Sequence, residues 1–205
     1  MRILVAAVIS EGILVALALA LQSIFSLQIV WNAQLDRIAW GVVLVLPPLA
    51  MNHILWRYSE RHPNSVYQRF SQEVIIPLCQ RVSWQLAVLI AILSGACEEL
   101  FFRGALHQLL LHSFGLVVSC AATSLLFASV HFIGSVKRYG RMIPLYAAMG
   151  AYLWCVQYAL DSLAAVAVLH GVYNFIVIML VKRQAAASLM NSPTSHSTGI
   201  DTPLC

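Results

Sequence analysis

Three charged residues, Glu98, Glu99 and Arg103, stand close together inside an otherwise apolar stretch of the sequence. A charged side chain at the centre of a membrane-spanning helix costs about 2.5–3.5 kcal/mol on insertion scales. Glu99 and Arg103 are four positions apart, so they share a helix face and can form an ion pair that offsets part of this cost. Glu98 points about 100° away from them, because a helix has about 3.6 residues per turn. No cation lies on its own face, which suits a carboxylate that acts as a general base.

Two further apolar segments each carry a histidine. His131 follows Phe127 by four positions, and Asn174 follows His170 by four, so His170 and Asn174 share a helix face. Taken alone, each histidine is equally well explained as a structural hydrogen-bonding residue between helices. Together, one carboxylate, two imidazoles and one amide are the groups that activation of water and stabilisation of an oxyanion require.

The composition indicates what kind of element carries these residues. The chain has 60% hydrophobic and 10% charged residues, with a mean hydropathy of +0.82, whereas a soluble domain has about 25% charged residues. We therefore expect an integral membrane protein with membrane lipids as its surroundings and little material for a soluble domain. The net charge of +4 does not indicate a nucleic-acid partner, because the basic residues fall where a membrane protein places them.

The apolar runs predict an all-α fold, a polytopic membrane helical bundle of about six transmembrane helices. The expected spans are 3–30, 38–56, 83–111, 116–133, 142–160 and 163–181. Glu11 interrupts the first span. Its carboxylate either lies near the membrane interface or lines a cavity, and the sequence does not choose between these positions.

The basic residues support this arrangement of spans. Ten of the twelve Lys and Arg residues precede the first span or follow the second, fourth and sixth, and these four places lie on one side of a six-span chain. The other two are Arg37 and Arg103. Because basic residues concentrate on the cytoplasmic side, both termini are predicted to be cytoplasmic.

Three motifs now resemble those of a known family. Glu98-Glu99-x-x-x-Arg103, Phe127-x-x-x-His131 and His170-x-x-x-Asn174 are similar, in order and in placement on separate spans, to the motifs of the CPBP intramembrane proteases. This family includes the CAAX-processing type II prenyl endopeptidases and their bacterial relatives. The resemblance covers about 83–182 and predicts a protease core in 83–183. Composition and hydropathy predict the other two regions: two transmembrane helices plus a basic cytoplasmic loop in 1–82, and a disordered tail in 184–205 that is rich in Ser, Thr and Pro.

The resemblance implies hydrolysis of a peptide bond within the membrane, in a membrane-bound peptide or protein substrate. By position, Glu98 corresponds to the base that activates water, and His131 to the residue that helps to hold it. His170 and Asn174 correspond to the groups that stabilise the oxyanion, and Glu99 and Arg103 to the ion pair that fixes the site. The short loops and small size favour a bacterial plasma membrane.

Two alternatives stay open at this stage. Glu98, His131 and His170 offer ligand types that zinc accepts, although the His-Glu-x-x-His pattern of many zinc hydrolases is absent; the favoured reading requires no cofactor. The second alternative is a non-enzymatic membrane carrier or interaction protein that uses the buried Glu/His cluster as a proton or ion relay. The clustering of the polar residues at one depth favours the enzyme, because a relay needs polar groups across the whole membrane.

Overall fold

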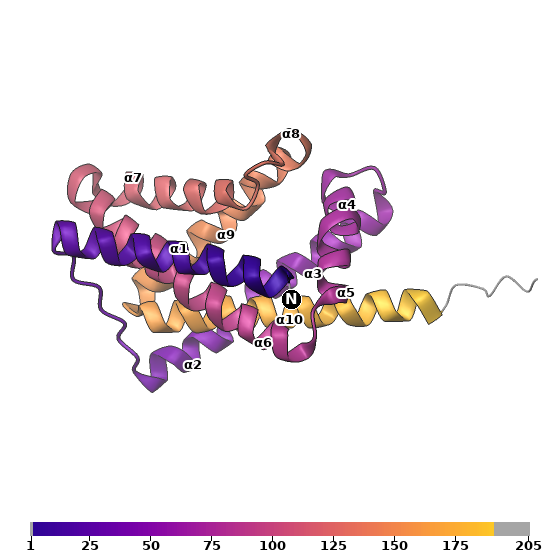
Figure 1. The fold of residues 1–205 in the computed structure, drawn as a ribbon, viewed down its shortest axis with the longest axis horizontal. Coiled ribbons are helices and arrows are strands. Elements are labelled where there is room, and N and C mark those ends of the chain that lie inside the picture. Colours follow the sequence, from indigo (N-terminus) through magenta and orange to yellow (C-terminus); the bar gives the residue numbers. More distant parts are fainter. Residues whose placement is uncertain (1, 191–205) are drawn as a thin grey trace, which may run out of the picture.

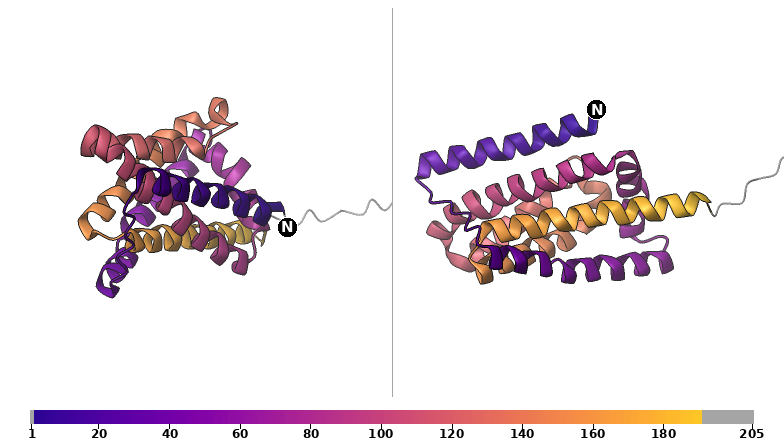
Figure 2. Two further views of the ribbon diagram at one scale, coloured as in Figure 1. Left: turned by 60° about the vertical axis from the view of Figure 1, so that its left-hand side comes forward. Right: turned by 90° about the horizontal axis from the view of Figure 1, so that it is seen from below.

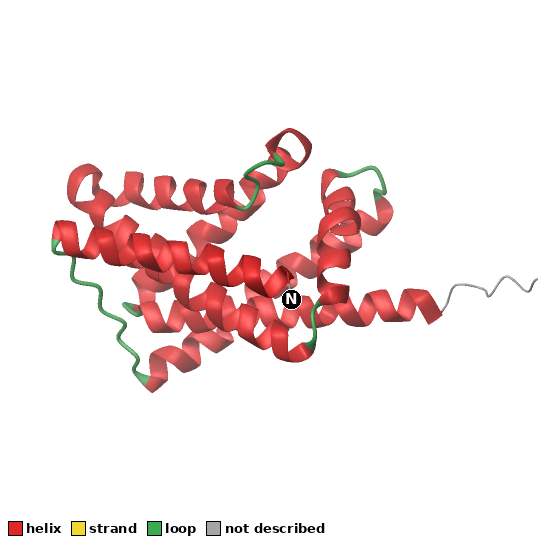
Figure 3. Ribbon diagram, viewed as in Figure 1, coloured by secondary structure: helices red, strands yellow, loops and turns green. Residues whose placement is uncertain are grey.

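The computed structural model describes residues 2–190 and is helical wherever those residues form regular structure (Figures 1 and 3). The expected all-α fold is confirmed for this part of the chain. The N-terminal half contains α1 (Arg2–Phe25), α2 (Leu35–Val43), α3 (Leu46–Arg61), α4 (Val66–Phe70), η1 (Ser71–Ile75), α5 (Ile76–Arg81), α6 (Trp84–Leu93) and η2 (Ser94–Glu98). It is followed by η3 (Leu100–Leu106), α7 (His107–Val130), α8 (Val136–Tyr139), η4 (Gly140–Met142), α9 (Ile143–Leu160) and α10 (Leu163–Met190).

Four helical stretches are long and apolar enough to cross a membrane: Ile3–Phe25, Leu35–Arg61, Trp84–Val130 and Leu163–Ala187. Their surfaces expose many large apolar side chains, such as Ile9 at 58% and Val117 at 80%. Water does not favour such surfaces, whereas lipid does, and helices satisfy their own backbone hydrogen bonds there. The chain is therefore an integral membrane protein. The count of six spans and the cytoplasmic position of both termini stay predictions.

Gly115 interrupts the longest of these stretches. Its backbone has φ 76° and ψ 177° within α7, a conformation that glycine adopts without the penalty of a Cβ atom. α7 is kinked at this point. The stretch is thus divided between the predicted third and fourth spans.

The last helix is longer than the sequence suggested. α10 continues through Met190, beyond the boundary at Gln184 where the tail was expected to begin. Ala185, Ala186 and Ala187 continue the helix, and alanine has the highest helix propensity of all residues. The rest of the predicted disordered tail, 191–205, lies outside the described residues.

The long helices lie side by side, and α10 is central to their packing (Figure 2). It contacts α6, η2, α2 and α5, while α7 packs on α9 and α1 packs on η2 and η3. Two glycines permit a close approach near the acidic motif: a Cβ atom on Gly95 would lie 2.5 Å from the carbonyl oxygen of Ala167, and one on Gly171 would lie 2.8 Å from that of Ala91. Small residues allow helices in membranes to approach closely in this way, and here they bring η2 and α6 against α10.

Candidate active site

The acidic motif lies on π-helical turns rather than on a regular α-helix. Glu98 ends η2, and Arg103 lies in η3. A π-helix has i→i+5 hydrogen bonds, is rare, and occurs frequently at functional sites. The sequence predicted that Glu99 and Arg103 share a face and pair. They do pair, with 3.0 Å between Oε1 of Glu99 and Nη1 of Arg103.

Glu99 connects the acidic motif to the last helix. Its side chain is fully buried, and its Oε1 atom also accepts a hydrogen bond from Nδ1 of His170 at 2.7 Å. Arg103 donates from Nη2 to the carbonyl oxygen of Gly150 at 3.0 Å. The charges of this network are thus paired through Oε1 of Glu99, as buried charges require, whereas Oε2 of Glu99 is buried without a hydrogen-bond partner among the described residues. The network ties η3, α9 and α10 together.

Glu98 faces His131 across a gap. Nε2 of His131 lies 3.9 Å from Oε2 of Glu98, which is too long for a direct hydrogen bond. Nδ1 of His131 lies 2.7 Å from the carbonyl oxygen of Phe127 and must donate to it, because a carbonyl only accepts. In neutral His131, Nε2 is therefore an acceptor, and it faces another acceptor. Oε2 of Glu98 is buried and has no hydrogen-bond partner among the described residues.

Asn174 lies one helical turn beyond His170 on α10. Its Nδ2 atom donates to Oγ of Ser94 at 2.8 Å, and Ser94 donates in turn to the carbonyl oxygen of Ala91 at 3.4 Å. Ser94 starts η2, the turn that Glu98 ends. Asn174 is thus held on the same two elements as Glu98 and His170, and an amide nitrogen bonded once still has a second N–H to donate.

Glu11 lies near the acidic motif. Its carboxylate interacts electrostatically with His170 and with Glu98, and its Oε2 atom is buried without a hydrogen-bond partner among the described residues. α1 brings it there by packing on η2. The residue as a whole is half-buried and lines neither of the two cavities described below.

Phe127 is the residue that sequence reasoning undervalued. Its ring lies 4.5 Å from the guanidinium carbon of Arg103, 4.8 Å from the ring of His131 and 5.8 Å from the ring of His170. It separates the Glu99 network from His131 while contacting both. Its spacing of four from His131 was the available signal. Sequence reasoning also missed Ser94, although it lies four positions before Glu98. The contact of Arg103 with the Gly150 carbonyl oxygen could not be predicted, because every residue has a backbone carbonyl.

Five of the six predicted residues therefore meet in one cluster: Glu98, Glu99, Arg103, His131 and His170. Asn174 lies one turn away. The cluster reaches the surface through His131, whose side chain is 30% exposed. Two cavities of about 710 and 370 Å³ are lined by other residues.

The carboxylate of Glu98 and the ring nitrogens of His131 and His170 are ligand types that zinc accepts. Zinc binds His nitrogen and carboxylate oxygen, usually in a tetrahedral arrangement. Within residues 2–190, no three His, Cys, Asp or Glu side chains are grouped so that they could hold a metal ion. Nδ1 of both His131 and His170 already has a partner, which leaves Nε2 of each ring free; histidines that bind metals usually have this arrangement. That the site requires no metal therefore stays a prediction.

Comparisons with known proteins bear on the same segment. Residues 80–176, just under half of the chain, match a family model described as "Type II CAAX prenyl endopeptidase Rce1-like". The match contains all three motifs and both close-packing glycines. Searches of curated proteins and of solved structures found no match.

Proposed function

We propose that the protein hydrolyses a peptide bond within the membrane, on the premise that residues 80–176 match the Rce1-like family model of type II CAAX prenyl endopeptidases. The family supports a protease. In the proposal, Glu98 is the general base, His131 holds the attacking water with it, and His170 and Asn174 stabilise the oxyanion. Glu99 and Arg103 position His170.

One observation carries the proposal: two hydrogen-bond acceptors, Oε2 of Glu98 and Nε2 of His131, face each other 3.9 Å apart. A single water molecule can donate one O–H to each of them. Both acceptors are fixed by the protein, since His131 is anchored through Phe127 and Glu98 ends a turn packed on α10. A water held in this way keeps its oxygen lone pairs free for attack on a carbonyl carbon.

The chemical steps follow from these positions. The water oxygen forms a bond to the scissile carbonyl carbon while Glu98 takes one of its protons, and the carbonyl oxygen becomes an oxyanion. As the carbon–nitrogen bond breaks, Glu98 returns the proton to the leaving nitrogen. The products are a carboxyl group and an amine, and no step passes through a metal ion.

The oxyanion needs donors that are already in place. Asn174 offers its second amide hydrogen, because Ser94 accepts the first. His170 donates from Nε2 when it carries both ring protons, since Nδ1–H is committed to Glu99. Among these four groups the charges then balance, with Glu98 and Glu99 negative and Arg103 and His170 positive; the nearby Glu11 carboxylate is not included. This balance limits the cost of burying them.

The six-span topology belongs to the proposal, and the ends of the bundle support it. Arg69, after the second expected span, lines one cavity with Arg138 and Arg141, which follow the fourth. Lys182, at the end of the sixth, donates to the carbonyl oxygens of Cys79 and Val82. These basic segments thus gather at one end, which the positive-inside rule makes cytoplasmic.

The substrate in this proposal is a membrane-bound peptide or protein, with a CAAX-type tail as the first to test because of the family's description. The proposed location is the bacterial plasma membrane, because the loops are short and the chain is small. In this proposal the substrate approaches from the end of α7, because His131 is the member of the cluster that is exposed there.

A cleavage assay in proteoliposomes tests the proposal. Wild-type protein and His131→Ala are reconstituted with membrane-anchored fluorescent peptides that end in CAAX and non-CAAX sequences. We expect cleavage by the wild type and its loss in His131→Ala, while both insert equally. A carrier that is not an enzyme would leave every peptide intact in both samples, even when the protein is inserted and folded.

A further inference from the structure

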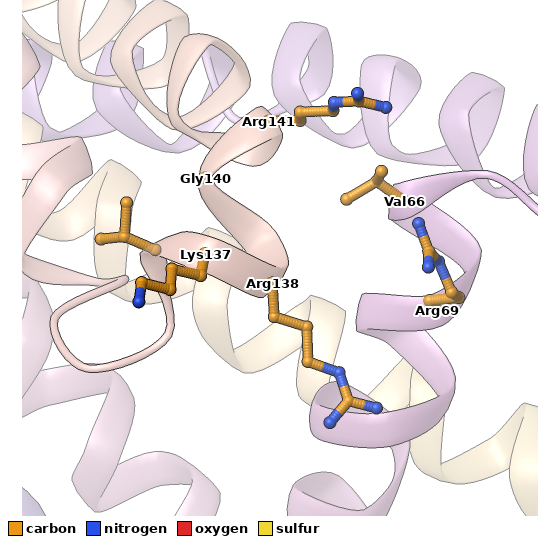
Figure 4. Close-up of a pocket in the computed structure, with 7 residues that line it drawn as sticks. Val66, Arg69, Lys137, Arg138, Gly140 and Arg141 are labelled. Atoms are coloured by element: carbon orange, nitrogen blue, oxygen red, sulfur yellow. The ribbon is translucent and has the colours of Figure 1, made fainter.

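A second site lies at the end of the bundle that carries the basic segments, away from Glu98. It is a cavity of about 710 Å³ between α4 on one side and α8 with η4 on the other. Four of the residues that line it are basic: Arg69, Lys137, Arg138 and Arg141. Among the described residues that line it, none is acidic. Figure 4 shows Arg138 and Arg141 extending from α8 and η4 toward α4, which contributes Arg69, whereas Lys137 turns to the other side.

One carboxylate, that of Glu73, interacts with Arg138 and with Arg69 and compensates part of this positive charge. Arg138 pairs with Glu73, with 2.6 Å between its Nη2 atom and Oε2 of Glu73. Within the described residues, no ion pair or side-chain hydrogen bond is formed by Arg69, Lys137 or Arg141. Like charges held near one another repel, and an anion between them removes that repulsion. The cavity is therefore complementary to a negatively charged group.

The arginines favour a phosphate in particular. A guanidinium is planar and presents paired N–H donors that match two oxygens of a phosphate at once. Guanidiniums from two separate segments line this cavity, so a phosphate that enters it can accept from both segments. Arg138 keeps one side of its fork on Glu73, so its position is set before the ligand arrives.

The rim of the cavity indicates where the phosphate comes from. Val66 and Val136 line it together with the cations. Val136, which begins α8, is 52% exposed, and Ile133, in the turn before α8, is 78% exposed. A ligand with an anionic head and an apolar body fits such a rim better than a freely soluble ion. In an integral membrane protein the adjoining phase supplies that ligand, because basic pockets at the cytoplasmic side bind anionic lipid headgroups.

We propose that Arg69, Arg138 and Arg141 bind the phosphate of an anionic phospholipid headgroup, with the acyl chains lying along Val136 and Ile133. This site is separate from the Glu98 cluster and does not depend on the proposed proteolysis. It differs from the general attraction of basic loops to anionic membranes, because specific side chains from α4 and from η4 have to act together.

Native mass spectrometry of the full chain in detergent measures this binding, with phosphatidylglycerol as the anionic probe and phosphatidylcholine as the neutral one. The test variant is R69Q/R141Q, which leaves the Arg138–Glu73 pair intact. The matched control is R61Q/R183Q, which removes two exposed arginines from other segments and changes the net charge equally. Each basic residue near the membrane contributes about fivefold to the affinity for an anionic lipid (about 1 kcal/mol, at 1.4 kcal/mol per tenfold).

We expect the wild type and R61Q/R183Q to retain phosphatidylglycerol equally and in preference to phosphatidylcholine, and R69Q/R141Q to bind it about thirtyfold more weakly, from two losses of about fivefold. Equal weakening in both double variants would mean general charge attraction and would overturn the site. Displacement of the lipid by inorganic phosphate or by a soluble peptide carboxylate at equal concentration would overturn the assignment to a lipid. Unchanged thermal unfolding of R69Q/R141Q shows that the variant is folded.

Discussion

Glu99 and His170 are 71 positions apart in the sequence, yet Nδ1 of His170 donates a hydrogen bond of 2.7 Å to Oε1 of Glu99. The same oxygen atom pairs with Arg103 at 3.0 Å. A single buried carboxylate oxygen therefore fixes the orientation of an imidazole on another helix. The ion pair of the acidic motif positions the histidine of the last motif, and it stabilises the packing of η3 against α10.

Substitution of Glu99 by glutamine should strongly destabilise the fold. It removes one partner of a fully buried pair and leaves the charge of Arg103 uncompensated, which costs about 3–5 kcal/mol. The free energy of unfolding in mixed detergent micelles measures this loss. Glu60→Gln is the matched control, since Glu60 pairs with Arg57 at the surface, where both side chains are about half exposed or more, and such a pair contributes at most about 1 kcal/mol. Similar losses in the two variants would contradict the account.

The contact between η2 and α10 should not tolerate a methyl group at Gly95. A Cβ atom there would lie 2.5 Å from the carbonyl oxygen of Ala167, so Gly95→Ala must push backbone from backbone. Overpacking of this kind costs about 1–3 kcal/mol, and it should also lower proteolysis because it moves Glu98 away from His170. Gly12→Ala is the control, because a Cβ atom there meets nothing within 4 Å. If Gly95→Ala and Gly12→Ala have the same free energy of unfolding and the same cleavage rate, the close approach of η2 to α10 is absent.

The Glu73–Tyr139 contact predicts a pH dependence of stability outside the membrane-spanning segments. The hydrogen bond from the Tyr139 hydroxyl, and then Arg138, hold the pKa of Glu73 below its ordinary value of 4.5. The folded state thus binds a proton less readily than the unfolded state. The stabilisation is fully present above pH 4.5 and is lost as the pH falls through the lower folded-state pKa. Thermal unfolding of the wild type between neutral and acidic pH should show this loss, and Glu73→Gln should lack it. If the unfolding temperature of Glu73→Gln falls with acidic pH as that of the wild type does, Glu73 is not the cause of the loss.

Asn174 and Ser94 should have separable effects on catalysis. Asn174→Ala removes an oxyanion donor, and loss of one such donor lowers kcat by about 10²–10³, with little change in KM. Ser94→Ala keeps the amide but removes the acceptor that orients it, so its effect on kcat should be smaller. Steady-state cleavage of a membrane-anchored peptide measures both. A larger loss in Ser94→Ala than in Asn174→Ala would contradict a direct role for Asn174.

The sequence predicted the class of fold, and which polar side chains lie together, better than it predicted their detailed geometry. The free-energy cost of placing the charged side chains of Glu98, Glu99 and Arg103 in lipid could be recognised from the sequence. Helices bury such side chains against one another, and this explains why they meet His131 and His170. The π-helical turns η2 and η3 were not visible, because no residue preference marks i→i+5 bonding.

Long-range contacts explain most of what the sequence left open. The place of Glu11 depends on how α1 packs on η2, and the place of Asn174 depends on the hydroxyl of Ser94. Gly115 was an indication of a kink, because glycine readily adopts a positive φ. A single glycine, however, does not determine where a helix bends. The extension of α10 past Gln184 reflects three alanines that composition alone assigned to a tail.

The central claim is that Glu98, and not the neighbouring Glu11, takes the proton from water. The most direct measurement is kcat for a membrane-anchored peptide cleaved by Glu98→Gln and by Glu11→Gln, each reconstituted at the same inserted density. We predict that Glu98→Gln loses about 10²–10⁴ in kcat, the usual contribution of a general base, and that Glu11→Gln keeps kcat within about tenfold of the wild type, because its carboxylate does not face His131 across the gap. Retention of wild-type kcat by Glu98→Gln, or the larger loss in Glu11→Gln, would contradict the account.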